Sequence, residues 1–197
     1  METAVRARGP YAKTKRVRES ILTIATEVFG ETGYRATTMK EIAARAGISE
    51  SGLAHHFPNK DELLAAVLEA REDRASELIP REAGMGALLA MLAIVVEDSA
   101  QPGIVELHTT IASEATSPEH PAHDHYSERY ESVRLFATRA FQAVAEQGTL
   151  RSTLTPTQLG AAYVALLDGL QLQWLYNRDG VQPVEVAKAF LASVIDT

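Results

Sequence analysis

Apolar residues recur at helical spacing along most of this chain. Between residues 13 and 33, for example, Ile21, Ile24 and Val28 lie three or four positions apart, which places them on one face of a helix. The same period, interrupted by glycine and proline, predicts nine helices and gives no convincing strand. Their expected bounds are about 13–33, 38–46, 50–57, 60–77 (or 81), 84–100, 104–117, 122–147, 155–176 and 183–195. The pattern therefore indicates an all-α fold.

Polar residues mark where several of these helices begin. Thr38, Asn59 and Thr155 are each followed three positions later by Glu or Gln. In this capping-box pattern two otherwise unpaired backbone amides are satisfied reciprocally. Pro156 suits the first position of a helix, where no backbone N–H is needed. These signals predict helix starts near residues 38, 60 and 156.

Residues 37–60, TTMKEIAARAGISESGLAHHFPNK, combine two short helices in a distinctive order. The first helix is amphipathic, Gly47 supplies a turn, and Ser49 caps the second helix, which Pro58 ends. This is the layout of a helix-turn-helix, whose second helix lies in the major groove of DNA. The segment therefore predicts sequence-specific binding to double-stranded DNA. The residues expected to form its core are Ile42, Ala43, Ile48, Leu53 and Phe57.

Charge is distributed unevenly, and the distribution favours a DNA-binding N-terminal part. The chain has a formal net charge of −7. Residues 1–62 carry ten Lys or Arg against eight Asp or Glu, whereas residues 63–197 carry nine against eighteen. Residues 1–12, which contain Gly9-Pro10, are expected to form a disordered basic arm that meets phosphates. The acidic remainder keeps the protein in solution.

Composition excludes several other classes of protein. No cysteine is present, which excludes a disulfide framework and a thiolate zinc site and suits a cytoplasmic protein. The basic N-terminus lacks the apolar core of a secretory signal. The longest apolar run, 87–96, is too short to span a bilayer, so no membrane partner is expected. The sequence shows no phosphate-binding loop or nucleophile–base pattern, so we expect neither an enzyme nor a cofactor.

The stretch from about Thr14 to Glu69 resembles the DNA-binding domain of the tetracycline-repressor (TetR) family of bacterial transcription regulators. The pieces that carry the resemblance are Phe29…Gly33-Tyr34, Thr37-Thr38-Met39, Ile42-Ala43, Ala46-Gly47-Ile48-Ser49, Leu53, His55-His56-Phe57 and Asn59-Lys60. It implies a three-helix DNA-binding domain over 13–60 and a helical ligand-binding and dimerisation domain over 61–197. It also implies a dimeric repressor that binds a palindromic operator and is released by a small molecule.

The helix-turn-helix also indicates which residues meet DNA. The expected contacts are Thr37, Thr38, Ser49, Ser51, Gly52, His55, His56 and Lys60. In the TetR family, the Thr that starts the second helix and the Lys that opens the fourth hold phosphates, which implies Thr37 or Thr38, and Lys60. His56 fits packing against the first helix equally well. Ala54 departs from the family, which commonly has an aromatic residue there, so relatives' operators do not predict this one.

The last two helices are apolar nearly all round, which predicts that they are buried. Reading two half-sites of a palindrome requires a two-fold dimer, and in the TetR family the last helices form its interface. The expected interface residues are Tyr163, Leu166, Leu170, Trp174, Phe190 and Val194. Packing within one subunit is the alternative.

In the TetR family, helices four to eight enclose a pocket for a small-molecule effector. The candidate lining residues are Met91, Val95, His108, Ile111, Tyr130, Arg134 and Trp174. His108 and Arg134 are polar residues among apolar ones, which makes them the better leads. Asp168 with Gln171 is a further lead, although Asp168 fits a local cap or ion pair as well.

The run HPAHDH contains three residues of metal-binding type, His120, His123 and His125. His123 and His125 are two positions apart and point to different sides of a helix, so no metal site is expected. Two other functions remain open. One is a TetR-like DNA-binding protein that has no small-molecule ligand and is regulated by a protein partner. The other is a metal-dependent enzyme that uses residues 120–125.

Overall fold

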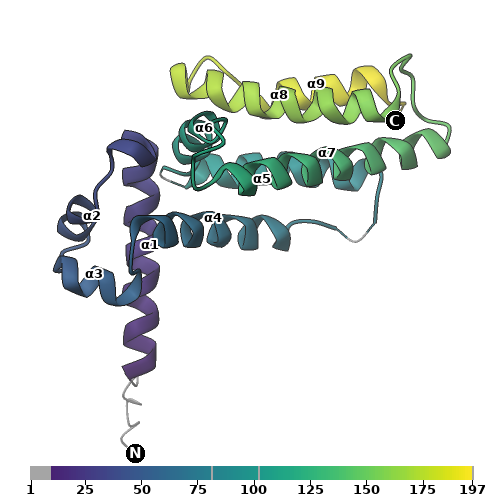
Figure 1. The fold of residues 1–197 in the computed structure, drawn as a ribbon. Helices are drawn as coiled ribbons and strands as arrows, with labels where there is room; N and C mark the ends of the chain where they lie inside the picture. The colour runs from purple at the N-terminus through teal and green to yellow at the C-terminus, as the bar shows by residue number, and fades with distance from the viewer. Residues whose placement is uncertain (1–9, 81, 102, 197) are drawn as a thin grey trace, which may run out of the picture.

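The computed structural model describes residues 10–80, 82–101 and 103–196, with side chains from residue 14 onward. The regular elements in these ranges are helices (Figure 1). They are α1 (Pro10–Ala36), α2 (Met39–Arg45), α3 (Glu50–His56), α4 (Lys60–Glu77), α5 (Met85–Ala100), α6 (Ile104–Glu114), α7 (His123–Glu146), α8 (Pro156–Tyr176) and α9 (Pro183–Val194). The predicted all-α fold and order of helices are confirmed within the described residues.

The predicted helix starts carry their caps. Thr155 and Gln158 make both hydrogen bonds of a capping box, with Pro156 in the first turn of α8. Thr38 and Asn59 each accept a hydrogen bond from the backbone N–H three residues later. The local sequence therefore determines where α2, α4 and α8 begin.

Helix α1 differs from its expected bounds at both ends. It begins at Pro10, inside the segment expected to be a disordered arm, and proline is compatible with the first turn of a helix. Residues 1–9 of that arm lie outside the described residues. Near its other end α1 is interrupted at Gly33, where φ is 75° and ψ is 171°, a conformation that favours glycine. A short turn then continues to Ala36.

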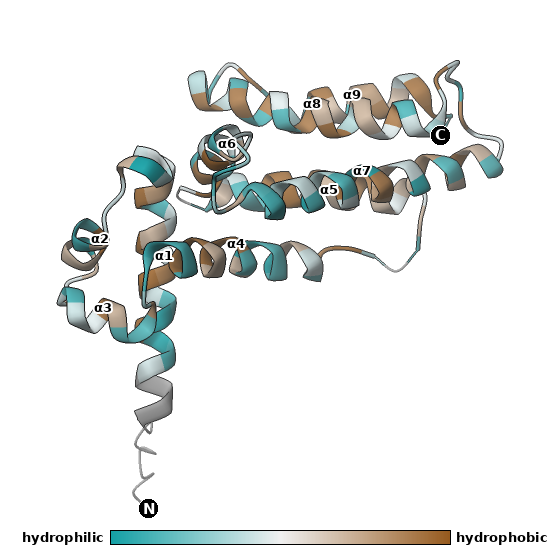
Figure 2. Ribbon diagram, in the orientation of Figure 1, coloured by the Kyte–Doolittle hydropathy of each residue, from teal (hydrophilic) through white to brown (hydrophobic). Residues whose placement is uncertain are grey.

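Two hydrophobic clusters hold the helices together. The first contains buried residues of α1, α2, α3, α4 and α6, with Tyr126 of α7, and Figure 1 shows α2 and α3 on one side of α1 with α4 extending from the other. The expected domain boundary at residue 60 falls inside this cluster, because Leu63, Leu64 and Val67 belong to it. The second cluster is formed by α5, α7, α8 and α9, and Figure 2 shows the many apolar residues of α8 and α9.

Helix α6 lies against α1 at very short range. A Cβ atom built on Gly30 would lie 2.9 Å from the backbone nitrogen of Leu107, and one built on Gly103 would lie 2.9 Å from the Cα of Glu27. Both distances are shorter than real Cβ contacts, so the two glycines permit this close approach. The contact joins the N-terminal helices directly to the C-terminal part of the molecule.

Candidate functional site

Helices α2 and α3 form the predicted helix-turn-helix. Thr38 caps α2 by accepting a hydrogen bond from the Glu41 N–H at 3.2 Å, and Ser49 caps α3 by accepting from the Gly52 N–H at 3.0 Å. Gly47 makes the turn between them. The buried residues beneath the two helices are Ile42, Ala43, Leu53 and Phe57.

The first turns of α3 present a polar surface. The exposed residues are Ser49, Glu50, Ser51, Ala54 and His55, with Gly52 and His56 half-buried. The hydroxyl oxygens of Ser49 and Ser51 lie 3.0 Å apart and share a hydrogen bond, so the helix cap also positions Ser51. Ala54 presents only a methyl group at this surface.

Of the two threonines expected at phosphates, Thr38 is exposed and Thr37 is buried. The Thr37 hydroxyl donates a hydrogen bond to the carbonyl of Gly33 at 2.6 Å and lies 2.7 Å from the hydroxyl of Thr32. The expectation for Thr37 therefore does not fit the structure, because its hydroxyl is already used inside the protein. Thr38 remains the candidate.

Lys60, expected to hold a phosphate, has structural contacts as well. Its ammonium donates hydrogen bonds to the backbone carbonyls of Tyr34 at 2.8 Å and Thr37 at 2.7 Å, and lies 4.3 Å from the centre of the Tyr34 ring. An ammonium has three N–H donors, so one remains for a phosphate oxygen. Burial and the hydrogen bond to Asp61 raise the pKa of Tyr34 to about 12, so this phenol stays protonated. Lys60 thus ties the start of α4 to the segment before α2.

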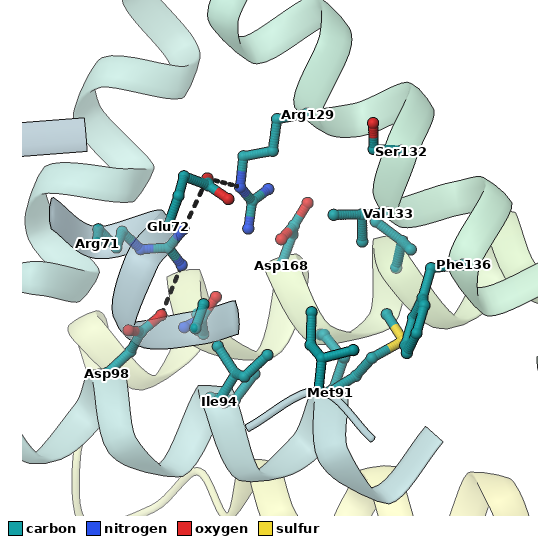
Figure 3. A pocket seen from close by; sticks show the side chains of 16 residues that line it. Arg71, Glu72, Met91, Ile94, Asp98, Arg129, Ser132, Val133, Phe136 and Asp168 are labelled. Carbon is teal, nitrogen blue, oxygen red and sulfur yellow. Dashed lines mark hydrogen bonds and ion pairs between the residues drawn. The ribbon is translucent and has the colours of Figure 1, made fainter. Parts of the chain in front are cut away.

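A cavity of about 310 Å³ lies between α4, α5, α7 and α8. Figure 3 shows charged side chains gathered at one end of it, whereas Met91, Val133 and Phe136 line the other. Two of the predicted ligand residues, Met91 and Val95, line this cavity. The other five do not: His108, Ile111, Tyr130, Arg134 and Trp174.

Sequence reasoning missed most of the charged end of the cavity. The Nη2 atom of Arg71 lies 2.6 Å from Oδ2 of Asp98, and both side chains are buried. Glu72 extends the network by accepting a hydrogen bond from Nε of Arg129 at 3.0 Å, as Figure 3 shows. The network joins α4, α5 and α7. One signal was available, since Arg71 follows Val67 by four residues on the buried face of α4, where a charge must be paired.

Several of these groups keep a defined charge state at neutral pH. Burial opposes the charged form of Arg71, but Asp98, together with Tyr126 and Glu72, outweighs burial and raises the pKa of Arg71 above its ordinary value. Burial lowers the pKa of His108 to about 4, so its imidazole is neutral at neutral pH. His108 Nε2 lies 3.4 Å from Oδ1 of Asp168. Although burial disfavours the Asp168 carboxylate, hydrogen bonds from His108 and Tyr130 lower its pKa, so it stays ionised.

Part of the predicted dimer interface is buried within the subunit. The Tyr163 hydroxyl donates a hydrogen bond to the carbonyl of Leu88 at 3.0 Å, and its ring stacks on Phe190. Leu170 is buried too. Tyr163 and Leu170 therefore follow the alternative of packing within one subunit, because neither is free to meet a partner. The half-buried members of the predicted set are Leu166, Trp174, Phe190 and Val194.

Other apolar residues of α8 and α9 are exposed. The exposed fractions are 42% for Leu172, 86% for Tyr176 and 43% for Val186. Leu172 and Tyr176 continue a helical stripe that begins with Ala165 and Gly169. We call this stripe and Val186 the α8–α9 apolar face. The spacing of this stripe is present in the sequence. Because α8 is apolar nearly all round, however, the sequence does not distinguish the exposed stripe from the larger buried residues beside it.

The histidine-rich segment is used mainly for local structure. His120 is buried, and its Nδ1 atom accepts a hydrogen bond from the Ala122 N–H at 3.1 Å. His123 donates from Nδ1 to the carbonyl of Ala115 at 2.8 Å. Across the described residues, no group of three or more His, Cys, Asp or Glu side chains is placed to hold a metal ion.

Membrane-spanning potential is limited to one bent pair of helices. Within the described ranges, no single helix has both the length and the apolar character needed to cross a bilayer. Helices α5 and α6 satisfy these criteria only when taken together, and they are bent by 107° relative to each other.

Known proteins resemble this chain over both of its parts. Residues 21–67 match the family described as bacterial regulatory proteins, tetR family, and residues 80–197 match the C-terminal part of BetI-type transcriptional repressors. The HTH-type transcriptional repressor KstR2 of Rhodococcus jostii is 27% identical over 187 residues, which cover 91% of this chain and 89% of the relative.

Solved structures share the fold. SmeT, the repressor of the Stenotrophomonas maltophilia multidrug efflux pump SmeDEF, aligns in its triclosan complex with a TM-score of 0.72 and 21% identity, over 92% of each chain. AibR in complex with isovaleryl coenzyme A and operator DNA aligns with a TM-score of 0.70 and 23% identity, over 91% of this chain and 98% of AibR. With two family matches that together span most of its length, the chain belongs to the TetR family of bacterial transcription regulators.

Proposed function

We propose that this regulator is a dimeric repressor that binds a palindromic operator and leaves it when a small molecule enters the cavity. The observation that carries the proposal is the course of α4. This helix begins at Lys60, which is bonded to the segment before α2, and about three turns later it presents Arg71 and Glu72 to the cavity. At 1.5 Å per residue, roughly 16 Å of helix separate Lys60 from Arg71. A ligand that displaces α4 therefore moves the helix-turn-helix.

Such a ligand acts through a difference in affinity. It releases the operator only if it binds the DNA-free conformation more tightly than the DNA-bound one. SmeT in complex with triclosan, and AibR in complex with isovaleryl coenzyme A and operator DNA, support a small-molecule response in proteins of this fold. For this chain, the chemical class of the effector has to be inferred from the residues that line its own cavity.

On DNA, α3 is proposed to lie in the major groove. Ser51 and His55 reach base edges from its exposed side, while Thr38 and the remaining donor of Lys60 hold phosphates. Ser49, Gly52 and His56 complete the proposed surface. Residues 13–60 then form the DNA-binding domain, and residues 61–197 form the part that binds the effector and the second subunit.

The second subunit is proposed to cover the α8–α9 apolar face. Exposed apolar residues on two neighbouring helices are typical of an interaction site, and a two-fold pair places two α3 helices on successive half-sites. Leu166, Trp174, Phe190 and Val194 flank the same face. The proposed location is the cytoplasm, where a bacterial regulator meets DNA.

The proposal is tested with the purified chain and the DNA that flanks its gene. A palindromic fragment should bind with an affinity that falls steeply as salt rises, because phosphate contacts release counterions. Ser51→Ala should change the ranking of operator variants, whereas Ser127→Ala, an exposed change on α7, should leave that ranking intact. Salt-independent binding, or none to any flanking fragment, would contradict the proposal.

A thermal-shift screen of small molecules, followed by operator release, tests the effector. A molecule that stabilises the protein and frees the DNA supports the proposed response. Release by a protein partner, with no small molecule active, would favour the alternative function instead.

A further inference from the structure

Asp168 is the carboxylate of the cavity that has no cationic partner. Three carboxylates and two guanidinium groups belong to the described residues that line the cavity. Two of the carboxylates have arginine partners, at 2.6 Å and 3.0 Å: Asp98 with Arg71, and Glu72 with Arg129. Within the described chain, the ion-pair contact of Asp168 is with His108 alone, at 3.4 Å, and that imidazole is neutral at neutral pH. The surplus negative charge of the cavity therefore lies on Asp168.

A ligand in the cavity can reach the Asp168 carboxylate. Its side chain lines the cavity and is 31% exposed, and Figure 3 shows it between the charged side chains and the apolar residues Val133 and Phe136. Although burial opposes its charged form, hydrogen bonds from His108 and Tyr130 lower its pKa, so it is ionised. A carboxylate has about four acceptor sites, so about two remain for a ligand.

The cavity wall beyond Asp168 is apolar. The apolar lining residues with large side chains include Met91, Ile94, Val95, Val133, Phe136, Val164 and Leu167. Such a wall favours the apolar part of a ligand, because contact with it removes apolar surface from water. At about 310 Å³ the cavity is at the small end for ligand sites. The ligand that fits this surface is therefore small, with one polar end and one apolar end.

We infer that the cavity takes a small amphipathic cation, a protonated amine on an apolar body, whose ammonium group donates hydrogen bonds to the Asp168 carboxylate. An ammonium has only donors and an ionised carboxylate has only acceptors, so the two groups satisfy each other. Hydrogen bonds between oppositely charged groups are also stronger than those between neutral ones. This inference rests on the proposed function, because it names the class of effector for that same cavity.

An anion bound to Arg129 is the strongest competing ligand. Nε of Arg129 already donates to Glu72 at 3.0 Å, and its guanidinium lies 5.7 Å from the centre of the Tyr130 ring. Figure 3 shows Arg129 between Glu72 and Asp168. An anion placed there would be attracted by one guanidinium and repelled by two carboxylates. The charges of the cavity therefore favour a cation over an anion.

A matched set of probes tests the inference on the full, DNA-free protein. The probes are hexylamine, hexanol and hexanoate, which have similar apolar chains and are cationic, neutral and anionic near neutral pH. Calorimetry or ligand-observed NMR should show hexylamine binding about 10-fold more tightly than hexanol, the difference expected for a hydrogen bond between charged groups. Hexanoate should bind more weakly than hexanol, because the surplus charge of the cavity repels it.

A pair of variants tests the role of Asp168. Asp168→Asn keeps the shape of the side chain and removes its charge, so it should reduce the preference for hexylamine over hexanol to about 2-fold or less, with hexanol affinity unchanged. Asp124→Asn removes the same charge from an exposed residue of α7 outside the cavity lining, and it should leave the preference intact. If Asp168→Asn fails to fold, a crystal structure of the unmodified protein with hexylamine provides the second test. Its nitrogen should lie about 3 Å from an Asp168 carboxylate oxygen.

Several outcomes would overturn the inference. They are equal binding of hexylamine and hexanol, tighter binding of hexanoate, no binding of any probe, an unchanged preference in Asp168→Asn, and an amine nitrogen bound away from Asp168. Operator release is measured separately. If hexylamine binds as expected but the operator complex persists, the inferred ligand class stands and the proposed response to ligand fails.

Discussion

Arg71 on α4 and Asp98 on α5 form a buried ion pair, with 2.6 Å between Nη2 and Oδ2, on the wall of the cavity. Removing one partner of such a pair leaves an unpaired charge on a largely buried side chain, which is strongly unfavourable. The pair therefore fixes α4 relative to α5. A ligand that shifts α4 must keep this ion pair intact or provide the separated charges with new partners.

Asp98→Ala should lower the free energy of unfolding by about 3–5 kcal/mol, because it strands the Arg71 guanidinium. Asp196→Ala is the matched control, since it breaks an Arg–Asp pair of 2.8 Å whose side chains are more than half exposed. Its effect should be about 0–1 kcal/mol. Urea denaturation of both variants measures the difference, and equal effects would contradict the assigned role of the buried pair.

His108 should make stability depend on pH with a definite sign. Its pKa is about 4 in the folded protein, against an ordinary value of 6.5. As pH falls from 6.5 to about 4, the unfolded chain binds a proton at His108 and the folded protein does not. The free energy of unfolding therefore decreases, by roughly 3 kcal/mol for this group.

His108→Asn should remove that part of the pH dependence, while the parts from His120 and His125, whose pKa values are also lowered, remain. Urea unfolding at a series of pH values measures the slope, and NMR titration follows the ring directly. A His108 ring that titrates near 6.5 in the folded protein would show that burial does not govern it.

Lys60→Ala should weaken binding to all operator variants about equally and should also destabilise the protein. The ammonium donates to two backbone carbonyls, and hydrogen bonds to a charged group contribute about 1.5–3 kcal/mol. Lys40→Ala, on the exposed side of α2, should leave the free energy of unfolding nearly unchanged. Fluorescence anisotropy and urea unfolding separate the two effects, and a loss of affinity confined to some operators would assign Lys60 to base reading.

Leu172→Glu should dissociate the proposed dimer, because it places a charge in the α8–α9 apolar face. Leu89→Glu on α5 is the matched control, since Leu89 is 43% exposed and Leu172 is 42% exposed. Light scattering should give a monomer for the first variant and a dimer for the second. A dimer in both cases would place the interface elsewhere.

The helices and the helix-turn-helix could be predicted because their signals are local. Thr38, Ser49 and Thr155 cap within three residues of themselves, and Ile42 and Leu53 follow the helical period. The Arg71–Asp98 pair could not be predicted in the same way, since its partners are 27 residues apart and meet only through the packing of α4 against α5.

The sequence also could not show which of two chemically similar residues is buried and which is exposed. Thr37 and Thr38 are both suited to a phosphate, and only the position of the Gly33 carbonyl shows that Thr37 is used internally. Tyr163 and Tyr176 lie on the same helix, yet one is fully buried and the other is 86% exposed. Which face of an apolar helix is buried depends on where its neighbours lie.

The close approach of α6 to α1 at Gly30 and Gly103 has a consequence for operator geometry. In a two-fold pair, the two α3 helices must be about one turn of DNA apart, roughly 34 Å. Helices α2 and α3 share a hydrophobic cluster with α1, and the backbone of α1 lies very close to the start of α6 at Gly30 and Gly103. A methyl group at either glycine would push α1 away from α6 and so change the orientation of α3. The spacing between the two half-sites therefore depends in part on the absence of a side chain at these two positions.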